Sequence, residues 1–312
     1  MTTTFVTGGT GFIGRVFVRR ARATGRRVQV LGRSPAAIQA IEALGGEPIE
    51  GDLLSAGAWQ QRLAEADEVV HLAQPLTFGG RVTSARANRY REQRGQMDRH
   101  LLDPLAGSAA RILYVGGTSF YGHQGEAQVD ETAPPNPRGW GPYIADAIVD
   151  LDRRIAAGAP LIVGFPGYVY GPGSWFAEYF FRPMMAGKRL TAMSGRSRMG
   201  SFIHVDDCAA ALLHLLERGA IGERYFVVDD APRTWSQFAE AFAGSAPVPV
   251  AIRRVPRWLV RVLLGPISSA SFDSDCRLSN AKLKASGYVF SFPTIDEGMP
   301  QVIATLRRSA RQ

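Results

Sequence analysis

The sequence predicts an α/β fold in which a doubly wound parallel sheet is joined to a smaller C-terminal lobe. Short apolar segments alternate with helical segments through the first 170 residues, and this alternation is typical of a parallel sheet with helices on both faces. The first strand runs into the glycine-rich segment TGGTGFIG (7–14), which then opens a helix. After residue 171 the chain becomes rich in aromatic residues, proline and arginine. The first part therefore has the pattern of a Rossmann-type domain, and the last part that of a separate lobe.

The expected elements follow in order along the chain. Segment 4–7 is short and apolar, Ile13, Val16 and Phe17 recur at helical spacing, and 28–31 has the pattern of a buried strand. Further strands are expected at 49–53, 68–73, 111–117 and 159–171, and helices near 35–44, 56–65, 88–106 and 144–157. The strand-like ERYFVVDD (223–230) is expected to return to the first sheet.

The glycine segment predicts a dinucleotide site. Gly8 and Gly11 permit a tight turn and a close approach of the backbone to a pyrophosphate, and Gly14 lets the helix pack against the sheet. The N-terminus of that helix adds free N–H groups and the positive end of a dipole. We therefore expect residues 1–170, with 200–230 returning to them, to form a dinucleotide-binding domain. The remaining segments, 171–199 and 231–312, are expected to form a substrate-binding lobe.

Two arginines favour NADP over NAD as the cofactor. An NAD site usually has an acidic residue at the end of the second strand, but Gly32 stands there, followed by Arg33. Arg15 directly follows the glycine segment. Two guanidinium groups without a carboxylate suit a 2′-phosphate. NAD stays open as a second choice, because Arg33 could simply begin a solvated loop.

The composition excludes several classes of protein. The chain has 312 residues, of which 46% are hydrophobic and 21% charged, as in ordinary globular proteins. Its two cysteines cannot form a disulfide framework, and no Cys/His cluster has metal-ligand spacing, so we expect no metal and a cytoplasmic location. The first strand candidate begins by Thr4, which leaves no room for a signal peptide.

The net charge of +8 raises the question of partners. The arginines are scattered and form no aromatic-interleaved basic ribbon, so we expect attraction for anionic ligands and no nucleic acid partner. No apolar run approaches the roughly 20 residues that span a bilayer, so no stable membrane insertion is expected. Segment 252–266 places Trp258 and Val262 at helical spacing, with Arg257 and Arg261 on another side. It could lie on a membrane surface or form a helix of the lobe. A small-molecule substrate is the expected partner, and a homodimer stays open.

Several motifs together resemble the extended short-chain dehydrogenase/reductases, the NAD-dependent epimerase/dehydratase family. They cover essentially the whole chain and are TGGTGFIG, GDL (51–53), HLA (71–73), FYG (120–122), DETAPPNP (130–137), PGYVYGPG (166–173), SFIHVDDCAAA (201–211) and RLSNAKLKASGY (277–288). In that family GDL and HLA flank the adenine end of the cofactor. The resemblance and the arginines above imply a cofactor-contact set of Gly8, Gly11, Phe12, Ile13, Gly14, Arg15, Arg33, Asp52, Leu53 and Ala73.

The same resemblance implies a catalytic triad that is incomplete here. The family has a Ser or Thr that bonds the substrate oxygen, a Tyr that transfers the proton, and a Lys four residues later that grips the nicotinamide ribose. The matching positions are Gly117, Tyr143 and Ala147. Without the lysine, we expect Tyr143 to act as a neutral proton donor or to be a packed tyrosine without a chemical role. Thr118 or Ser119 could supply the missing hydroxyl if the turn after the strand brings either one back.

Two further side chains are catalytic candidates. Asp146 lies on the tyrosine helix and could be a carboxylate base, or an acid placed in the first turn by the helix dipole. His123 follows FYG, where loops of the family border the substrate, but a lone loop histidine is commonly a solvated side chain.

Three functional hypotheses follow. The first is an NADP-dependent oxidoreductase that acts on a small carbonyl or alcohol, and the aromatic residues Trp140, Trp175, Phe176 and Tyr179 favour an apolar or aromatic substrate. The second is a non-redox cyclase, isomerase or lyase. The third is a protein that senses a dinucleotide without catalysis. The maintained glycine segment favours the first, and the missing triad residues favour the other two.

Overall fold

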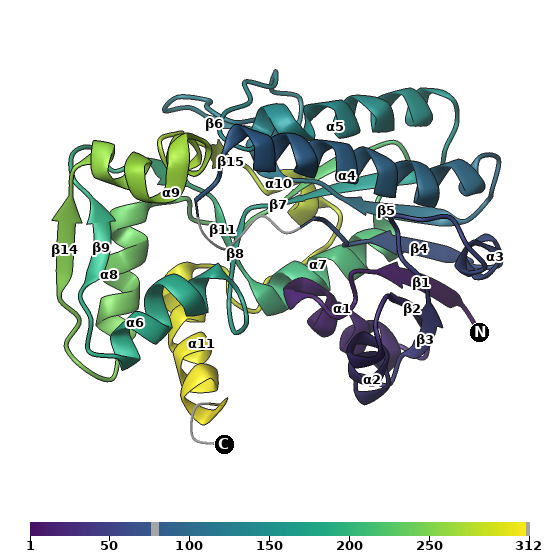
Figure 1. Cartoon of the computed structure of the whole chain (residues 1–312), viewed down its shortest axis with the longest axis horizontal. Coiled ribbons are helices and arrows are strands. Elements are labelled where there is room, and N and C mark those ends of the chain that lie inside the picture. The colour runs from purple at the N-terminus through teal and green to yellow at the C-terminus, as the bar shows by residue number, and fades with distance from the viewer. Residues whose placement is uncertain (76–80, 310–312) are drawn as a thin grey trace.

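The computed structural model describes residues 1–75 and 81–309 and confirms the predicted doubly wound α/β fold with a smaller lobe (Figure 1). Within those residues, a central sheet has seven parallel strands in the order β12-β7-β5-β4-β1-β2-β3. They are β1 (Thr3–Thr7), β2 (Arg27–Gly32), β3 (Glu47–Glu50), β4 (Glu68–His71), β5 (Arg111–Val115), β7 (Leu161–Pro166) and β12 (Arg224–Val227).

The strand order changes direction between β1 and β4, which lie side by side with Thr7 opposite His71. In an open α/β sheet the loops at the carboxyl ends diverge at such a point and leave a crevice where ligands bind. Since the glycine segment directly follows β1, this crevice positions the candidate cofactor site.

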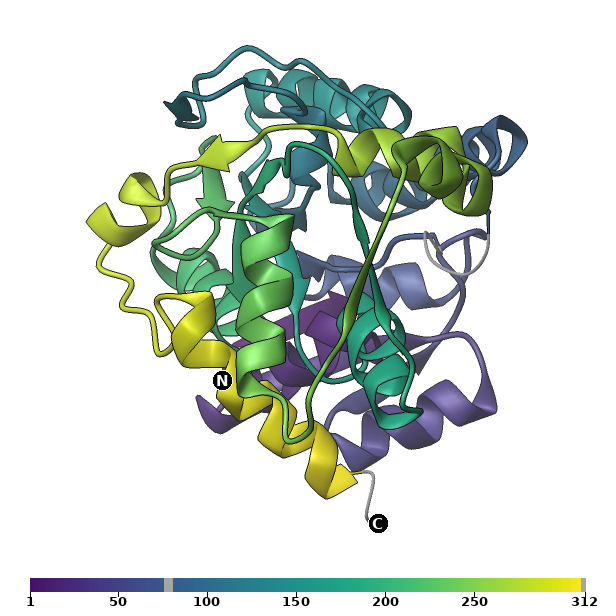
Figure 2. The same cartoon turned by 90° about the vertical axis from the view of Figure 1, so that its left-hand side faces the viewer.

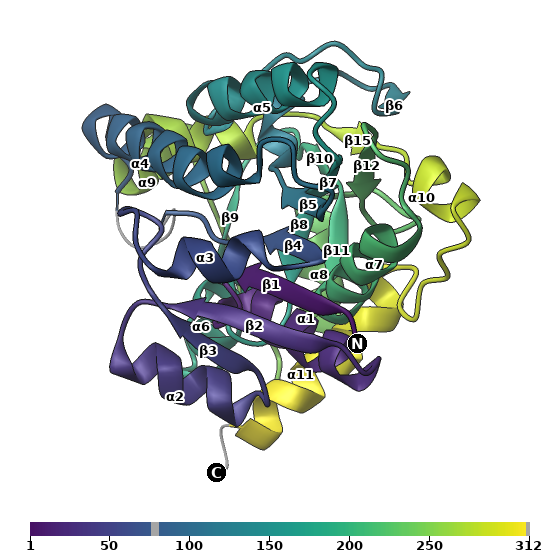
Figure 3. The same ribbon diagram turned by 90° about the vertical axis from the view of Figure 1, so that its right-hand side faces the viewer.

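Helices cover both faces of the sheet (Figure 3). Apolar side chains of α3 (Trp59–Ala64), α4 (Ser84–Leu102) and α5 (Gly141–Ala156) pack against one face. Those of α1 (Phe12–Ala23), α2 (Pro35–Ala43) and α7 (Val205–Arg218) pack against the other. The strand residues alternate between these two cores, with Phe5 in the first and Val6 in the second, because successive side chains of a strand point to opposite faces.

The lobe lies beside the carboxyl ends of the strands and has an aromatic core of its own (Figures 1 and 2). Its helices are α6 (Arg182–Met185), α8 (Trp235–Ser245), α9 (Arg257–Phe272) and α11 (Ile295–Ser309), while α10 (Ala281–Ala285) contacts β12. Short strand pairs complete the structure: β6 (Gln128–Val129) with β15 (Arg277–Leu278), β8 (Tyr168–Tyr170) with β11 (Phe202–His204), β9 (Leu190–Met193) with β14 (Ile252–Val255), and β10 (Met199–Gly200) with β13 (Arg233–Thr234).

Helix α9 is bent in its middle. Gly265 has φ of +86° and is followed by Pro266, so the helix changes direction there. A side chain at this position would meet the carbonyl oxygen of Val82, whose own N–H donates to Leu264 O at 3.1 Å. The bend therefore fixes α9 against the segment that precedes α4.

Candidate cofactor and catalytic site

The glycine turn after β1 is packed too closely to admit side chains. Gly8 has φ of +72°, and a Cβ atom there would lie 2.6 Å from the Ala73 nitrogen at the end of β4. A Cβ atom on Gly14 would collide with the Gly8 carbonyl oxygen. The first turn of α1 therefore packs directly against the loop.

The N-terminus of α1 is left open toward that end of the sheet. Its N-cap is Gly11, which offers no side chain to cap the helix. In the described part of the chain no group accepts from the N–H groups of Phe12, Ile13 or Gly14. Such N–H groups at a helix N-terminus are ready donors to a phosphate. Arg15 is fixed nearby, because its Nε donates to the Thr10 carbonyl at 2.8 Å.

The end of β2 has a glycine, Gly32, where an NAD site usually has an acidic residue, and a side chain there would require the end of Ile41 to move. A Cβ atom on Gly32 would lie 2.8 Å from Ile41 Cδ1. The next residue, Arg33, is exposed and makes no ion pair within the described residues. A free guanidinium thus lies at the position where the ribose of a dinucleotide is bound in this type of fold.

The adenine side of the predicted site is formed by the loops after β3 and β4. Asp52 Oδ1 accepts from Leu54 N at 3.0 Å, so this carboxylate orders its own turn. Leu53 is buried, and its carbonyl accepts from His100 Nδ1 at 2.7 Å. The Ala73 carbonyl accepts from Arg94 Nη1 at 3.1 Å.

A buried polar network lies directly beneath this site, and sequence analysis missed it. Asp98 forms hydrogen bonds with His71 Nε2 at 3.2 Å and with the Tyr114 hydroxyl at 2.8 Å, and Thr7 Oγ1 lies 2.7 Å from His71 Nδ1.

Arg94 also pairs with Asp98 and donates to the carbonyls of Ala73 and Val115, at the ends of β4 and β5. The i,i+4 spacing of Arg94 and Asp98 was the available signal.

Charge in this network is balanced between Arg94 and Asp98. Burial lowers the pKa of His71, so its ring is neutral, and although burial opposes it, Arg94 keeps the pKa of Asp98 below its usual range. The network thus holds one cation and one anion, and it braces the two strand ends that border the crevice.

The turn after β5 contains two residues with hydroxyl groups, Thr118 and Ser119. They follow Gly117, which stands where the family has the Ser or Thr of its catalytic triad. β5 ends at Val115, and Thr118–Phe120 form a short helical turn. A Cβ atom on Gly117 would lie 3.6 Å from Ser119 Oγ but only 3.2 Å from Ile144 Cδ1. The hydroxyl of Ser119 therefore lies close to where a side chain at position 117 would begin.

Thr118 and Ser119 line a small cavity of about 20 Å³ between the sheet domain and the lobe. The other lining residues are Gly122, Arg138, Tyr168, Ser201, Ser271, Ser274, Cys276 and Leu278. Arg138 is exposed and makes no ion pair within residues 1–75 and 81–309. It is a cation beside the candidate hydroxyls that sequence analysis did not identify.

Tyr143 lies in the first turn of α5, half-buried, with its ring centroid 6.4 Å from that of Trp140. Its hydroxyl makes no hydrogen bond within the described residues, so it is free to meet a ligand. Tyr143, Asp146 and Ala147 line a groove of about 820 Å³ between α4 and α5. Asp146 accepts from Arg91 Nε at 2.6 Å in an exposed ion pair.

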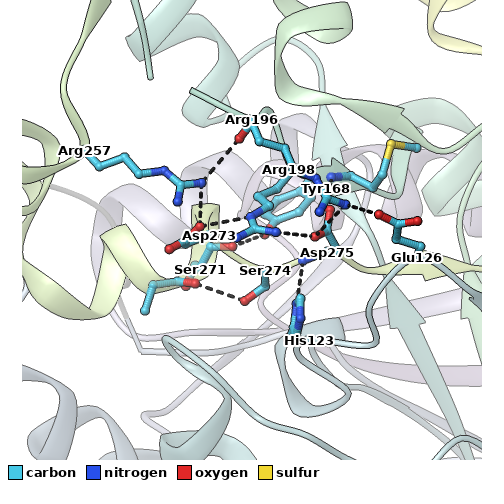
Figure 4. Close-up of polar contacts among 12 residues, drawn as sticks. His123, Glu126, Tyr168, Arg196, Arg198, Arg257, Ser271, Asp273, Ser274 and Asp275 are labelled. Carbon is cyan, nitrogen blue, oxygen red and sulfur yellow. Dashed lines mark hydrogen bonds and ion pairs between the residues drawn. The ribbon is translucent and has the colours of Figure 1, made fainter. Parts of the chain in front are cut away.

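His123 belongs to a polar network that joins the sheet domain to the lobe (Figure 4). Its Nδ1 accepts from the backbone N–H of Asp275 at 3.0 Å, and Asp275 in turn pairs with Arg198 at 2.7 Å. Partial burial, and next the nearby Arg138, lower the pKa of His123, so the ring is neutral. With Nδ1 as acceptor, the proton is on Nε2. His123 is not among the described residues that line the small cavity beside Thr118 and Ser119.

The described residues contain neither a cluster of metal ligands nor a membrane-spanning helix. In residues 1–75 and 81–309, no three His, Cys, Asp or Glu side chains gather as metal ligands would. Over the same residues, every helix is too short or too polar to cross a bilayer.

The chain is similar to known proteins over most of its length. The model of the NAD dependent epimerase/dehydratase family matches residues 4–228. A "3-diazoavenalumate denitrifying reductase" from a Streptomyces species is 31% identical over 83% of this chain and 86% of its own. A "4-hydroxy-2-methyl-3-oxo-4-farnesyl-3,4-dihydroquinoline-1-oxide ketoreductase" from Stigmatella aurantiaca is 30% identical over 73% of this chain and 69% of its own.

Solved structures share the fold at lower identity. The human epimerase family protein SDR39U1, crystallised with NADPH, superposes with a TM-score of 0.77 at 20% identity, covering 97% of this chain and 99% of that one. A dTDP-glucose 4,6-dehydratase from Bacillus anthracis in complex with NAD has a TM-score of 0.81 at 16% identity, covering 100% and 98%.

Proposed function

Since this chain belongs to the NAD-dependent epimerase/dehydratase family, we propose that it is a cytoplasmic, NADP-dependent oxidoreductase that acts on a small apolar or aromatic carbonyl or alcohol. The observation that carries the proposal is the glycine turn, whose backbone is open to a pyrophosphate and closed to side chains. The two relatives of 30% and 31% identity are both named as reductases, which supports a redox role. The two cysteines are unpaired, which fits a reducing compartment.

The residues present fit a dinucleotide. The N–H groups of Phe12, Ile13 and Gly14 would hold the pyrophosphate, and Arg15 and Arg33 the 2′-phosphate. Asp52, Leu53 and Ala73 would border the adenine end. We assign cofactor binding to residues 1–170 with 200–230, and substrate binding to the lobe formed by 171–199 and 231–312. When bound, the nicotinamide supplies or accepts a hydride.

Removing the positive charge of Arg33 tests the choice of cofactor. NADPH should bind more tightly than NADH. Arg33→Asp should reduce the difference between their dissociation constants, because the new carboxylate repels the 2′-phosphate of NADPH and can accept hydrogen bonds from the ribose hydroxyls of NADH. Fluorescence titration gives both dissociation constants. Arg19→Asp, which also removes an exposed arginine but lies away from the crevice on α1, serves as the control. Equal constants for NADPH and NADH, unchanged in Arg33→Asp, would contradict the 2′-phosphate assignment.

We assign the catalytic step to side chains after β5 and at the start of α5. Ser119 lines the small cavity and Tyr143 the groove between α4 and α5, so the substrate oxygen would have to reach both. Ser119, supported by Thr118, would donate a hydrogen bond to the substrate oxygen and polarise it. Tyr143 would then donate its phenolic proton to that oxygen as hydride arrives at the carbon. Ser119 is a candidate for this role because its Oγ would lie 3.6 Å from a Cβ atom on Gly117, and Thr118 stays the alternative. Phe176 is buried in the core of the lobe and Trp175 packs against that core, whereas Tyr168 lines the cavity beside Ser119 and would contact the rest of the substrate.

Restoring the missing lysine tests the role of the tyrosine. An ammonium group beside the phenol stabilises the phenolate, so Ala147→Lys should shift the pH–rate profile to lower pH. Ala147 lines the open groove between α4 and α5, which gives the longer side chain room. Ala147→Met is the uncharged control of similar length. A profile that stays in place in a folded Ala147→Lys protein would mean that Tyr143 is not the titrating group.

Transfer of label from the cofactor tests the redox role directly. The protein is incubated with 4-deuterated NADPH and a panel of aryl ketones and aryl aldehydes, and the products are examined by mass spectrometry. Deuterium on the carbinol carbon of any product supports the proposal. Product without deuterium and without loss of NADPH absorbance would contradict it.

A non-redox isomerase, cyclase or lyase is the second candidate, favoured by the absence of side-chain chemistry at Gly117 and Ala147. In such an enzyme Asp146 or His123 would carry the proton. The exposed ion pair between Asp146 and Arg91 disfavours a catalytic role for that carboxylate, since its Oδ2 already accepts from the guanidinium.

A further inference from the structure

The outer side of α9 exposes large apolar side chains close together. Trp258 is 66% exposed, Val262 55% and Leu263 57%, all within six residues of the helix. Single exposed apolar residues are ordinary on protein surfaces, but a cluster that contains a tryptophan marks an interaction surface. The inner side of the same helix is already occupied, because Val260 and Ile267 are buried and Leu264 O bonds Val82 N. The outer side is therefore available to a partner.

Positive charge surrounds this apolar cluster. Between Glu240 and Asp273 the sequence has four arginines and no acidic residue. Arg257 pairs with Asp273 at 2.7 Å, but Arg253, Arg254 and Arg261 are exposed and make no ion pair within the described residues. Arg253 and Arg254 lie on β14, which pairs with β9 alone among the described residues and ends two residues before the start of α9. We call the three apolar residues and these three free arginines the α9 patch.

The α9 patch lies on the periphery of the molecule. Helix α9 forms the outer rim of the lobe, away from the central sheet, and β14 is the outermost strand beside it (Figures 1 and 2). A flat surface could therefore approach both elements at once and meet one of Arg253 and Arg254, whose side chains point to opposite faces of β14. A second copy of the chain is a poor occupant, since a two-fold contact would bring the arginines of one patch against those of the other.

We propose that the α9 patch binds the surface of a membrane that contains anionic lipids. Tryptophan and aliphatic side chains on one side of a helix enter the boundary between headgroups and acyl chains, and flanking arginines bind the lipid phosphates. This mode of binding needs no spanning helix, in keeping with the lengths and polarity of the described helices. It is independent of the proposed reaction, because none of these side chains lines the cavity or the groove of the candidate site.

Vesicle binding tests the proposal on the full chain. Purified protein is sedimented with vesicles of phosphatidylcholine alone and with vesicles that contain about one quarter phosphatidylglycerol, at low and high salt. We expect binding to the anionic vesicles at low salt, weakened by salt. Trp258→Glu/Val262→Glu should lower the partition coefficient at least tenfold. Arg261→Gln should lower it by about fivefold, the effect of one basic residue near an anionic surface.

A matched control separates this surface from general apolar exposure. Val149→Glu/Val289→Glu also replaces two exposed apolar residues, 42% and 83% exposed, but on α5 and in the segment before α11. It should bind anionic vesicles like the unmodified protein, and all variants should bind NADPH equally if they are folded. No binding to anionic vesicles at low salt would overturn the proposal. Equal loss in the control variant, or a dimer in solution that Trp258→Glu/Val262→Glu dissociates, would also overturn it.

Discussion

Replacing Tyr143 by phenylalanine is expected to lower kcat by about 10²–10⁴-fold, the usual contribution of a general acid. The substitution removes one hydroxyl that makes no hydrogen bond in the described structure, so the packing of the ring on Trp140 and the stability of α5 should be preserved. The dissociation constant of NADPH should change by no more than about twofold, because no lysine couples the phenol to the cofactor. Steady-state kinetics and a fluorescence titration on the same preparation measure both quantities.

Two further variants give this measurement its discriminating power. Under the oxidoreductase hypothesis, Asp146→Asn should change kcat very little, because the carboxylate that it replaces is held in an exposed ion pair with Arg91. His123→Ala should lower kcat by an intermediate amount. It removes the ring nitrogen that accepts from Asp275 N, in the network between the sheet domain and the lobe. Turnover that survives Tyr143→Phe, falls in either of the other variants and consumes no NADPH would favour the non-redox hypothesis instead.

The parts of the site that sequence could predict are those that depend on local backbone. The spacing of Gly8, Gly11 and Gly14 indicates a turn between a strand and a helix, because Gly11 and Gly14 both closely approach the Gly8 carbonyl within that turn. The close approach of Gly8 to Ala73 joins distant segments and is not visible in the spacing. The strand-helix alternation was equally local, and it correctly predicted the doubly wound sheet. Element boundaries differ, as in α4, which begins at Ser84 instead of 88 because Thr83 caps its first turn. The single strand predicted at 159–171 is instead two strands, β7 in the central sheet and β8, which pairs with β11.

The parts that sequence could not predict depend on contacts between distant segments. Arg94 and Asp98 lie on a helix rich in polar residues, yet they are buried, and Tyr114 and His71, 16 and 27 residues away from Asp98, supply partners at the sheet surface. The ion pair of Asp146 joins residues 55 apart, and the bond between His123 and Asp275 joins residues 152 apart. No periodicity or spacing in the chain records such pairings.

The sequence also could not predict which hydroxyl group, that of Thr118 or that of Ser119, lies close to Gly117. Whether Thr118 or Ser119 returns toward Gly117 depends on where β5 ends, and a strand boundary shifted by one residue would exchange the two. Because β5 ends at Val115 and the chain then turns helically, Ser119 lies beside the empty position.

A single methyl group on Gly14 is expected to raise the dissociation constant of NADPH by about 10²-fold or more. The Cβ atom of Gly14→Ala would collide with the Gly8 carbonyl and approach Gly9 Cα at 2.7 Å, so the start of α1 must move away from the loop. The N–H groups of Phe12 and Ile13 would then miss the pyrophosphate, and each hydrogen bond to a charged group contributes roughly 1.5–3 kcal/mol. Overpacking should also lower the free energy of unfolding by about 1–3 kcal/mol.

Gly244→Ala is a matched control for this change, because it makes the same substitution inside another helix. Gly244 lies in α8 with no atom within 4 Å of its added Cβ. An alanine there should leave NADPH binding unchanged and raise the free energy of unfolding by up to about 1 kcal/mol, since alanine is the better helix former. Titration with NADPH and urea unfolding of both variants separate the two effects. A Gly14→Ala protein that binds NADPH as tightly as the Gly244→Ala protein would show that the cofactor is not held by the N-terminus of α1, and the proposed oxidoreductase would lose its main support.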